Sequence, residues 1–417
     1  MLATVALMFL IAAIVIGFVR SINVGFVCLG LALILGLIGG VSSKEILGGF
    51  PSSLFMTLLG TMFFFSLLQE NHTLELLSKK MVGLVGKKHF LIPILIYLVS
   101  YLLSAAGPGA ISVQTVMIIF AVALAVQMDA SPILMGGMAI LGAVGGTTSP
   151  IALTGILVKD LTAGMEGLEN IASPVFFGVS AANFLCAVLL YILYGGFRLK
   201  GENEVKEKLP AFTRNQMICI AALLVMVVAV VGFRYDVGLV CFTLSLVLML
   251  LGTVNEKGAL KLVPWSVLIL ICGVNVLMSV TKTLGGIDLL ADLLAKLMNR
   301  TTASPIMSLT AGMMSWFSSA NGVVFPTLIP TAPAIAANVG GGVTAADLIM
   351  AIVGAATVAG ISPMSTGGSL ILASYTQGKE VSDKEQSKIF ARLFATSLGC
   401  VAAIMVFGLV GGFKLFG

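Results

Sequence analysis

Charged side chains are scarce in this sequence. Only 10% of the 417 residues are Asp, Glu, Lys or Arg, whereas 59% are hydrophobic and the mean hydropathy is +1.11. A soluble domain has about 25% charged residues, so these few charges cannot cover the water-facing surface of so long a chain. The shortage excludes soluble enzymes, nucleic-acid-binding proteins and secreted disulfide scaffolds. It predicts an all-α polytopic membrane protein in a lipid bilayer.

Motifs for catalysis and cofactor binding are missing as well. The sequence has no P-loop, so ATP is not expected to drive the protein directly. All six cysteines lie in apolar runs without metal-ligand spacing. His72 and His89 lie near clustered lysines and are expected on a solvated surface. No nucleophile or metal-ligand set is recognisable, so we expect neither enzymatic activity nor a cofactor.

Apolar runs of membrane-spanning length are abundant. A helix needs about 20 residues to cross the hydrocarbon core, and eight uninterrupted runs approach or exceed this length. They are residues 2–19, 23–40, 51–69, 174–197, 214–232, 236–253, 264–281 and 389–412. Two further apolar stretches, 90–159 and 303–376, are interrupted by Gly, Pro, Ser and Thr at shorter intervals. We expect the function to reside in these interrupted stretches.

The chain contains an internal repeat with an offset of 213 residues. Val24-Gly25-Phe26-Val27-Cys28 corresponds to Val237-Gly238-Leu239-Val240-Cys241, Pro51 to Pro264, Gly60 to Gly273, and Ser149-Pro150 to Ser362-Pro363. Chance similarity among apolar residues would not hold Gly and Pro in one register. We therefore expect a first repeat over 1–197, a linker over 198–213 and a second repeat over 214–417.

Each repeat is expected to contain three helices, a short amphipathic segment, a re-entrant hairpin, a broken helix and a last helix. The hairpins are expected at 90–126 and 304–338, and the broken helices at 131–159 and 344–376. A hairpin adds zero or two crossings, so each repeat crosses an odd number of times and the second must be inverted. Inverted repeats with discontinuous helices are typical of secondary transporters.

The distribution of Lys and Arg predicts the orientation. Most of the 23 basic residues fall on the side that holds the 198–213 linker. The positive-inside rule then places this linker in the cytoplasm and both termini outside. We expect a multi-pass protein of a bacterial-type inner (plasma) membrane.

Four small-residue clusters form the predicted site. Two lie at the hairpin tips and two at the helix breaks, where proline frees backbone groups, a new helix N-terminus favours an anion and oxygens suit a small cation. The predicted anion-binding residues are Ala106, Gly107, Pro108, Gly109, Thr147, Thr148, Ser149, Pro150, Asn321, Gly322, Ser362, Pro363, Ser365 and Thr366. The predicted Na+ ligands, through backbone and hydroxyl oxygens, are Ser104, Gly145, Gly146, Ser318, Ser319 and Gly360.

Between Phe90 and Val158 the only Asp, Glu, Lys, Arg or His is Asp129, and between Thr301 and Thr376 it is Asp347. Asp129 precedes a Ser-Pro helix start and Asp347 follows Thr344 by three residues, so both are expected to cap helices. Asn183 and Asn275 are expected to form interhelical hydrogen bonds. A site without titratable groups favours Na+ over H+ as the coupling ion.

The order of these elements resembles the divalent anion/Na+ symporter family and the wider ion transporter superfamily. Within roughly residues 1–160 the chain contains four characteristic segments, Ile22-Asn23-Val24-Gly25, Lys44-Glu45-Ile46, Gly48-Gly49-Phe50-Pro51 and Ala106-Gly107-Pro108-Gly109. These segments resemble MatC-type malonate and dicarboxylate carriers.

The resemblance implies small dicarboxylate substrates such as malonate, Na+ coupling, a homodimer and an elevator mechanism. The moving transport domain would comprise 90–197 and 304–417, and the scaffold 1–84 and 214–298. Family hairpins carry Ser-Asn-Thr, where this chain has Ala106-Gly107-Pro108 and Ala320-Asn321-Gly322, so only Asn321 is retained. Anion contacts would then depend on backbone N–H groups and hydroxyls.

The sequence thus predicts a secondary transporter that carries a small organic anion inward with Na+. Two alternatives stay open. One is the large membrane subunit of a TRAP-type transporter, which depends on a soluble binding protein. The other is an anion carrier coupled to H+.

Overall fold

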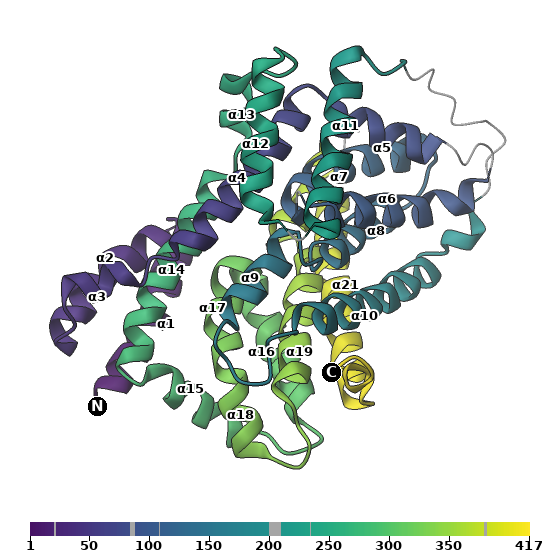
Figure 1. Cartoon of the computed structure of the whole chain (residues 1–417). Coiled ribbons are helices and arrows are strands. Elements are labelled where there is room, and N and C mark those ends of the chain that lie inside the picture. Colours follow the sequence, from purple (N-terminus) through teal and green to yellow (C-terminus); the bar gives the residue numbers. More distant parts are fainter. Residues whose placement is uncertain (21, 84–87, 108, 200–209, 234, 379–381) are drawn as a thin grey trace.

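The computed structural model describes residues 1–20, 22–83, 88–107, 109–199, 210–233, 235–378 and 382–417. Within these ranges all regular elements are helical (Figure 1), which confirms the predicted all-α class. Pro108 of the predicted site and residues 200–209 of the predicted linker lie outside the described residues.

The helices follow the chain in this order: α1 (Leu2–Arg20), α2 (Val24–Gly39), α3 (Ser43–Gly48), α4 (Ser52–Glu70), α5 (Thr73–Gly83), α6 (Ile92–Ala105), α7 (Gly109–Gln127), α8 (Pro132–Gly146), α9 (Leu153–Leu161), α10 (Ala172–Leu193), α11 (Arg214–Val227), α12 (Val237–Leu250), α13 (Glu256–Leu262), α14 (Trp265–Thr283), α15 (Gly286–Ala295), α16 (Ala303–Phe317), α17 (Phe325–Leu328), α18 (Ala332–Val339), α19 (Ala345–Val358), α20 (Thr366–Gly378) and α21 (Asp383–Leu409). Short 3-10 or π-helical turns are η1 (His89–Leu91), η2 (Gly196–Arg198), η3 (Val228–Gly232), η4 (Ala320–Val324), η5 (Ile329–Thr331), η6 (Ala359–Ile361) and η7 (Gly412–Leu415).

Seven helical stretches of the described chain are long and apolar enough to cross a membrane. They are Ser43–Glu70, Gly109–Val126, Ala172–Leu193, Trp265–Thr283, Ala320–Val339, Ala345–Thr376 and Lys384–Leu409. The eight uninterrupted runs predicted from the sequence coincide with α1, α2, α4, α10, α11, α12, α14 and α21. Large apolar side chains such as Leu33 and Leu250 are exposed on these helices, as expected for surfaces that face lipid.

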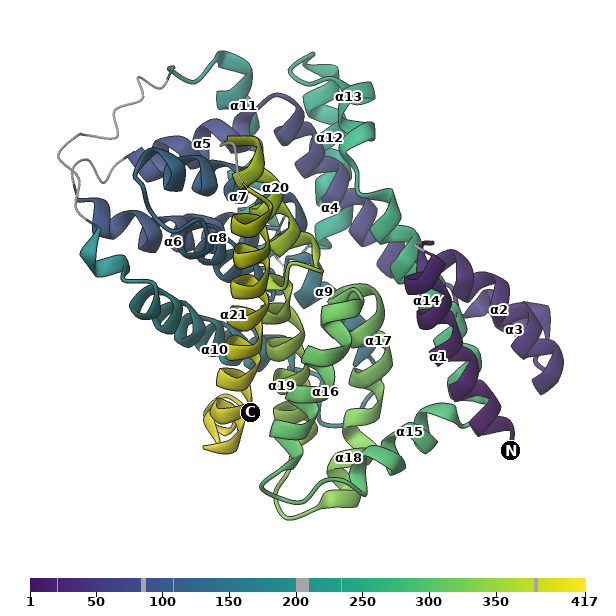
Figure 2. The same cartoon turned by 180° about the vertical axis from the view of Figure 1, so that it is seen from behind.

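The helices form an arm and a body. The arm, made of α1–α3 and α14, extends to one side, and α10 lies on the opposite side of the body in both views (Figures 1 and 2). In the body, α8 is buried against α6, α7 and α10, while α19 is buried against α16 and α21. At the foot of the arm, α15 packs against both α1 and α18. The interrupted stretches therefore lie in the body.

Two helix crossings that are related by the repeat bring backbones into direct contact. A Cβ atom on Gly273 of α14 would lie 2.2 Å from the carbonyl oxygen of Gly25 in α2. A Cβ atom on Gly60 of α4 would lie 2.4 Å from the carbonyl oxygen of Gly238 in α12. Any side chain would collide with backbone at these positions, so both crossings require glycine. The offset of 213 residues converts one pair into the other.

Helix caps recur in the same register. The Asn23 side chain caps α2 and Asp236 caps α12. Ser42 caps α3 and Asn255 caps α13. In each case a side-chain oxygen accepts a backbone N–H of the first turn, which would otherwise lack a partner. Local structure thus follows the sequence repeat.

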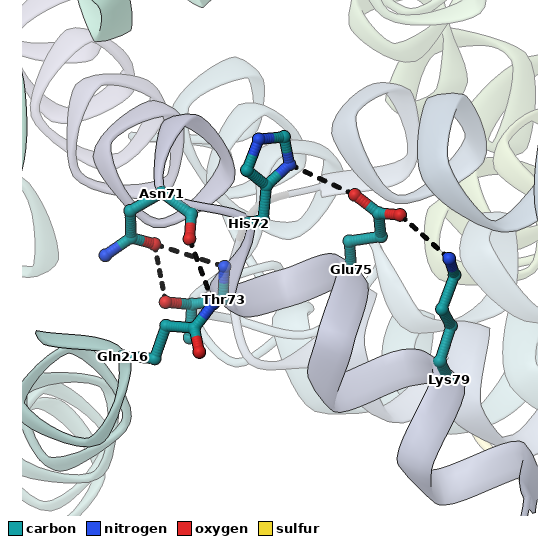
Figure 3. A network of polar contacts seen from close by, with 6 residues as sticks. All are labelled: Asn71, His72, Thr73, Glu75, Lys79 and Gln216. Carbon is teal, nitrogen blue, oxygen red and sulfur yellow. Dashed lines mark hydrogen bonds and ion pairs between the residues drawn. The ribbon is translucent and has the colours of Figure 1, made fainter. Parts of the chain in front are cut away.

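A polar junction joins the end of α4 to the start of α11 (Figure 3). The side-chain oxygen of Asn71 accepts the backbone N–H of Thr73 at 3.1 Å. The Gln216 side chain donates to the backbone carbonyl of Asn71 at 3.1 Å. The junction holds the sharp turn between α4 and α5 against the beginning of the second repeat.

A short charged network lies beside this junction (Figure 3). Glu75 contacts Lys79 at 3.0 Å and the His72 ring at 3.1 Å. The hydrogen bond from Lys79 holds the pKa of the Glu75 carboxyl below its ordinary value. His72 is exposed as predicted, but the surface position predicted for His89 is wrong, because η1 packs at the start of α6 and buries the ring.

Candidate functional site

The first predicted break separates α8 from α9. Gly145 and Gly146 end α8, and Thr147, Thr148 and Ser149 are buried just after it; Pro150 is exposed. The Thr147 carbonyl accepts the backbone N–H groups of Thr154 and Gly155, both at 3.1 Å. These two N–H groups of the α9 first turn are therefore bonded locally, which leaves fewer for an anion than the sequence predicts.

The second predicted break separates α19 and η6 from α20. Gly360 is half-buried in η6, Ser362 and Pro363 are buried, and Thr366 is exposed at the start of α20. The hydroxyl of Ser365 donates to the Ser362 carbonyl at 2.8 Å and also to the Gly360 carbonyl. The unwound segment thus provides hydrogen-bond donors for two of its own backbone carbonyl groups.

The two breaks share one close contact. A Cβ atom on Gly155 would lie 2.0 Å from the Ser149 carbonyl oxygen, and one on Gly368 would lie 2.2 Å from the Ser362 carbonyl oxygen. Both contacts require glycine and are again related by the offset of 213 residues. In each break the new helix folds back tightly onto the carbonyl before the proline.

The first predicted tip lies on the first break. Gly107 and Gly109 have φ values of +136° and +74°, which favour glycine. A Cβ atom on Gly109 would lie 3.5 Å from the Thr147 hydroxyl, and one on Gly107 would lie 2.7 Å from the Phe65 ring of α4. The structure therefore brings Gly109 together with Thr147, and Gly107 lies beside Phe65 and the Ile151 carbonyl, which follows Pro150. Ala106 is half-buried at the end of α6.

The second predicted tip reaches the first break from the other repeat. Asn321 in η4 accepts a hydrogen bond from the Thr154 hydroxyl of α9 at 2.9 Å. The Ser319 hydroxyl accepts the Gly322 N–H at 3.1 Å, and the Ser318 hydroxyl donates to the Met314 carbonyl at 2.7 Å. Thr154, which the sequence did not indicate, is thus the direct link between the first break and the second tip.

The helix after the second break packs in turn on the first repeat. A Cβ atom on Gly367 would lie 3.0 Å from Ile140 of α8, and one on Gly136 would lie 2.6 Å from Ile371 of α20. Helix α20 also packs along α7, the helix that follows the first tip. All four predicted clusters therefore lie in a connected region of the body.

Several buried polar atoms in this region lack a hydrogen-bond partner within the described residues. They include the hydroxyls of Ser104 and Thr147 and both side-chain polar atoms of Asn183. Asn183 of α10 lies beside the first break, since a Cβ atom on Gly145 would lie 3.6 Å from the Asn183 Cβ. Buried polar groups normally have partners, so these atoms are candidates for contacts to a ligand or ion.

Three expectations about polar residues are wrong. Ser131, not Asp129, caps α8, because its hydroxyl accepts the Leu134 N–H while Asp129 adopts a left-handed turn with φ +48°. Asn275 donates to the Ile271 carbonyl of its own helix at 2.9 Å and does not bridge helices. Asn183 has no hydrogen-bond partner in the described part of the chain. Its isolated polarity within α10 is the signal that could have marked it as a candidate site residue.

The predicted start of α19 is confirmed. The Thr344 hydroxyl accepts the Asp347 backbone N–H at 3.1 Å, the contact expected from a helix cap. The Asp347 side chain is 4% exposed, and its Oδ1 atom has no hydrogen-bond partner within the described residues.

Residues 1–147 match the family model described as "Dicarboxylate carrier protein MatC N-terminus". The chain is similar to the Alcanivorax borkumensis YdaH transporter, with 14% identity and a TM-score of 0.60 over 91% of this chain and 87% of that chain. It is equally similar to Neisseria gonorrhoeae MtrF, described as illuminating a class of antimetabolite efflux pumps, with 14% identity and a TM-score of 0.60 over 91% of this chain and 84% of that chain. No curated protein sequence matches the chain.

At this low identity the structural likeness establishes the fold alone. The resemblance to MatC-type carriers predicted from the sequence is confirmed over residues 1–147. The chain is a multi-span, all-helical membrane protein with the fold of known transporters, and residues 1–147 match the N-terminal model of the MatC dicarboxylate carriers.

Proposed function

We propose that this chain is a secondary active transporter that carries a small organic anion, with malonate as the first candidate, together with Na+. The observation that carries the proposal is the meeting of the first tip, the first break and the second tip around Thr147 and Thr154. Irregular backbone inside a membrane protein is tolerated where it is enclosed by protein or lines a cavity. The dicarboxylate carrier family of residues 1–147 supports an organic acid as the substrate and a carrier rather than an enzyme.

The proposed architecture is a pair of inverted repeats with re-entrant hairpins, as expected from the sequence. The reciprocal pairs Gly25–Gly273 and Gly238–Gly60 support it, because a two-fold relation between repeats exchanges such contacts. We assign α1–α5 and α11–α15 to a scaffold and the remaining helices to a transport domain that slides as an elevator. A homodimer in the inner membrane, with the 198–213 linker cytoplasmic and both termini outside, completes the proposal.

Na+ is the proposed coupling ion because oxygen atoms without partners border the first break. The Ser104 and Thr147 hydroxyls and the Asn183 carbonyl oxygen are buried and have no hydrogen-bond partner among the described residues. Small cations prefer such oxygen ligands. The predicted ligands Ser318 and Ser319 already form hydrogen bonds, so we place more weight on the first break.

Uptake into proteoliposomes tests the proposed activity. We expect labelled malonate to accumulate when an inward Na+ gradient is imposed, and not with a K+ gradient of equal size. Accumulation driven by a pH gradient alone would support the H+-coupled alternative. Absence of malonate and succinate uptake under all three gradients would contradict the proposal and favour a transporter that depends on a binding protein.

Replacing Thr147 with valine tests the proposed cation site. Valine has the shape of threonine without the buried hydroxyl, so the variant should be more stable than the parent by about 1 kcal/mol without Na+. It should also lose most of the stabilisation by Na+, which for a site filled at 100 times its Kd is about 2.7 kcal/mol. Thermal unfolding in detergent with NaCl or choline chloride measures both effects.

Thr281→Val is the matched control for this experiment. Thr281 is equally buried, but its hydroxyl donates to the Leu277 carbonyl of its own helix, in the arm. The control should retain the full response to Na+. An unchanged Na+ response in Thr147→Val would remove Thr147 from the site.

A further inference from the structure

A polar cavity lies at the end of the molecule where α16 and α19 begin. Its volume is about 150 Å³, and its lining includes Arg300, Ser304, Asp347, Gly408, Leu409 and Lys414. None of its lining residues belongs to the tips or breaks described above. The cavity is larger than a single water requires, so it can accept a small polar group.

Charges of both signs line this cavity. Arg300 and Lys414 are exposed and form no ion pair within the described residues. Asp347 is 4% exposed, and its Oδ1 atom lacks a hydrogen-bond partner in the described part of the chain, as does the buried Ser304 hydroxyl. The N-termini of α16 and α19 add partial positive charge. The lining therefore suits a ligand with a negative group and a positive group.

Exposed apolar side chains lie in and next to the lining segments of the cavity. Leu409 lines the cavity and is 50% exposed, and the neighbouring Val406, Val410 and Leu415 are 56%, 74% and 80% exposed. Val406 and Leu409 belong to α21, one of the helices long and apolar enough to cross a membrane. A polar cavity at the end of such a helix, next to an apolar surface, has the layout of a lipid headgroup and its acyl chains.

We propose that this cavity binds the headgroup of a phospholipid that carries a primary ammonium group, as phosphatidylethanolamine does. The phosphate lies between Arg300 and Lys414, which provide charge-assisted donors. The ammonium donates to the Oδ1 atom of Asp347 and to the Ser304 hydroxyl, two oxygen atoms that have no hydrogen-bond partner within the described residues. The acyl chains run along Val406 and Leu409. This assignment does not depend on which anion is transported.

Native mass spectrometry of the full chain, with defined lipids added, tests the proposal. The wild-type protein should retain phosphatidylethanolamine over phosphatidylglycerol, which lacks the ammonium, and over phosphatidylcholine, whose methylated ammonium has no N–H donor. Asp347→Asn should abolish this preference. Arg300→Gln and Lys414→Gln should each weaken retention of phosphatidylethanolamine about tenfold, the effect of one charge-assisted hydrogen bond. Lys296→Gln removes an exposed cation outside the cavity and should leave retention unchanged.

Free phosphoethanolamine, added as a competitor, separates the headgroup from the chains. Because the acyl chains add contacts along Val406 and Leu409, free phosphoethanolamine should displace the lipid only at a concentration far above that of the lipid. Displacement at equal concentration would overturn the lipid assignment and leave a site for a soluble zwitterion. Equal retention of the three lipids, or an unchanged preference in a folded Asp347→Asn variant, would overturn the proposal altogether.

Discussion

Gly25→Ala is expected to destabilise the folded chain by about 3 kcal/mol, the upper end of the usual cost of overpacking. A Cβ atom on Gly25 would lie 2.3 Å from the carbonyl oxygen of Ile269 in α14. Backbone cannot yield as a flexible side chain can, so α2 and α14 must separate along their whole crossing. Thermal unfolding in detergent, together with the yield of monodisperse protein, measures the effect.

Gly30→Ala is the matched control, because Gly30 lies on the same helix and a Cβ atom there would meet nothing within 4 Å. Alanine is the better helix former by roughly 0.8–1.0 kcal/mol, so this variant should be as stable as the wild type or more so. Similar unfolding temperatures for both variants would contradict the close crossing of α2 and α14.

The second large effect is expected at Thr154. Thr154→Val keeps the shape of the side chain but removes the hydroxyl that donates to Asn321 at 2.9 Å. The side-chain oxygen of Asn321, in the second repeat, then lacks the donor that the first repeat provided. Leaving this oxygen unpaired destabilises the folded chain by about 1–3 kcal/mol. We expect Na+-driven uptake to fall roughly tenfold or more, because each 1.4 kcal/mol corresponds to a factor of ten.

Three comparisons make the Thr154 experiment specific. Thr154→Ser retains a hydroxyl and should restore most of the uptake. Thr310→Val removes a hydroxyl that donates only to the Ile306 carbonyl of its own helix at 2.9 Å, and it should transport normally. The loss in Thr154→Val/Asn321→Ala should be no larger than in Asn321→Ala alone, since both changes break one hydrogen bond. Undiminished uptake by the properly inserted Thr154→Val variant would refute a role for this contact.

The sequence predicts the helices well because apolar runs and the Gly, Ser and Pro residues that interrupt them determine structure over short distances along the chain. Each uninterrupted apolar run forms one helix, and the Gly-Gly and Ser-Pro segments end α8 and separate α19 from α20. The register between repeats extends to details that the sequence does not display, such as the folding of Gly155 onto Ser149 and of Gly368 onto Ser362. A duplicated sequence therefore carries duplicated local packing.

Contacts between distant residues could not be read from spacing. Thr154 and Asn321 are 167 residues apart, and neither the hydropathy pattern nor the break motifs indicate which hydroxyl meets which amide. The sequence predicts a partner on another helix for Asn183, yet Asn183 lies beside the Gly145 end of α8 without a hydrogen-bond partner in the described residues. Asp129 failed as a cap for a local reason: Ser131 lies one residue before the helix and takes that role.

The reciprocal crossings also constrain how the protein is made. Gly25 contacts Gly273, and Gly60 contacts Gly238. Helices α2 and α4 therefore pack against helices that are synthesised much later. When the ribosome has completed only the first repeat, α2 and α4 can enter the bilayer, but their glycine faces have nothing to pack against. Until α12 and α14 leave the translocon, α2 and α4 therefore lack these partners, although α8 can already pack against α6, α7 and α10.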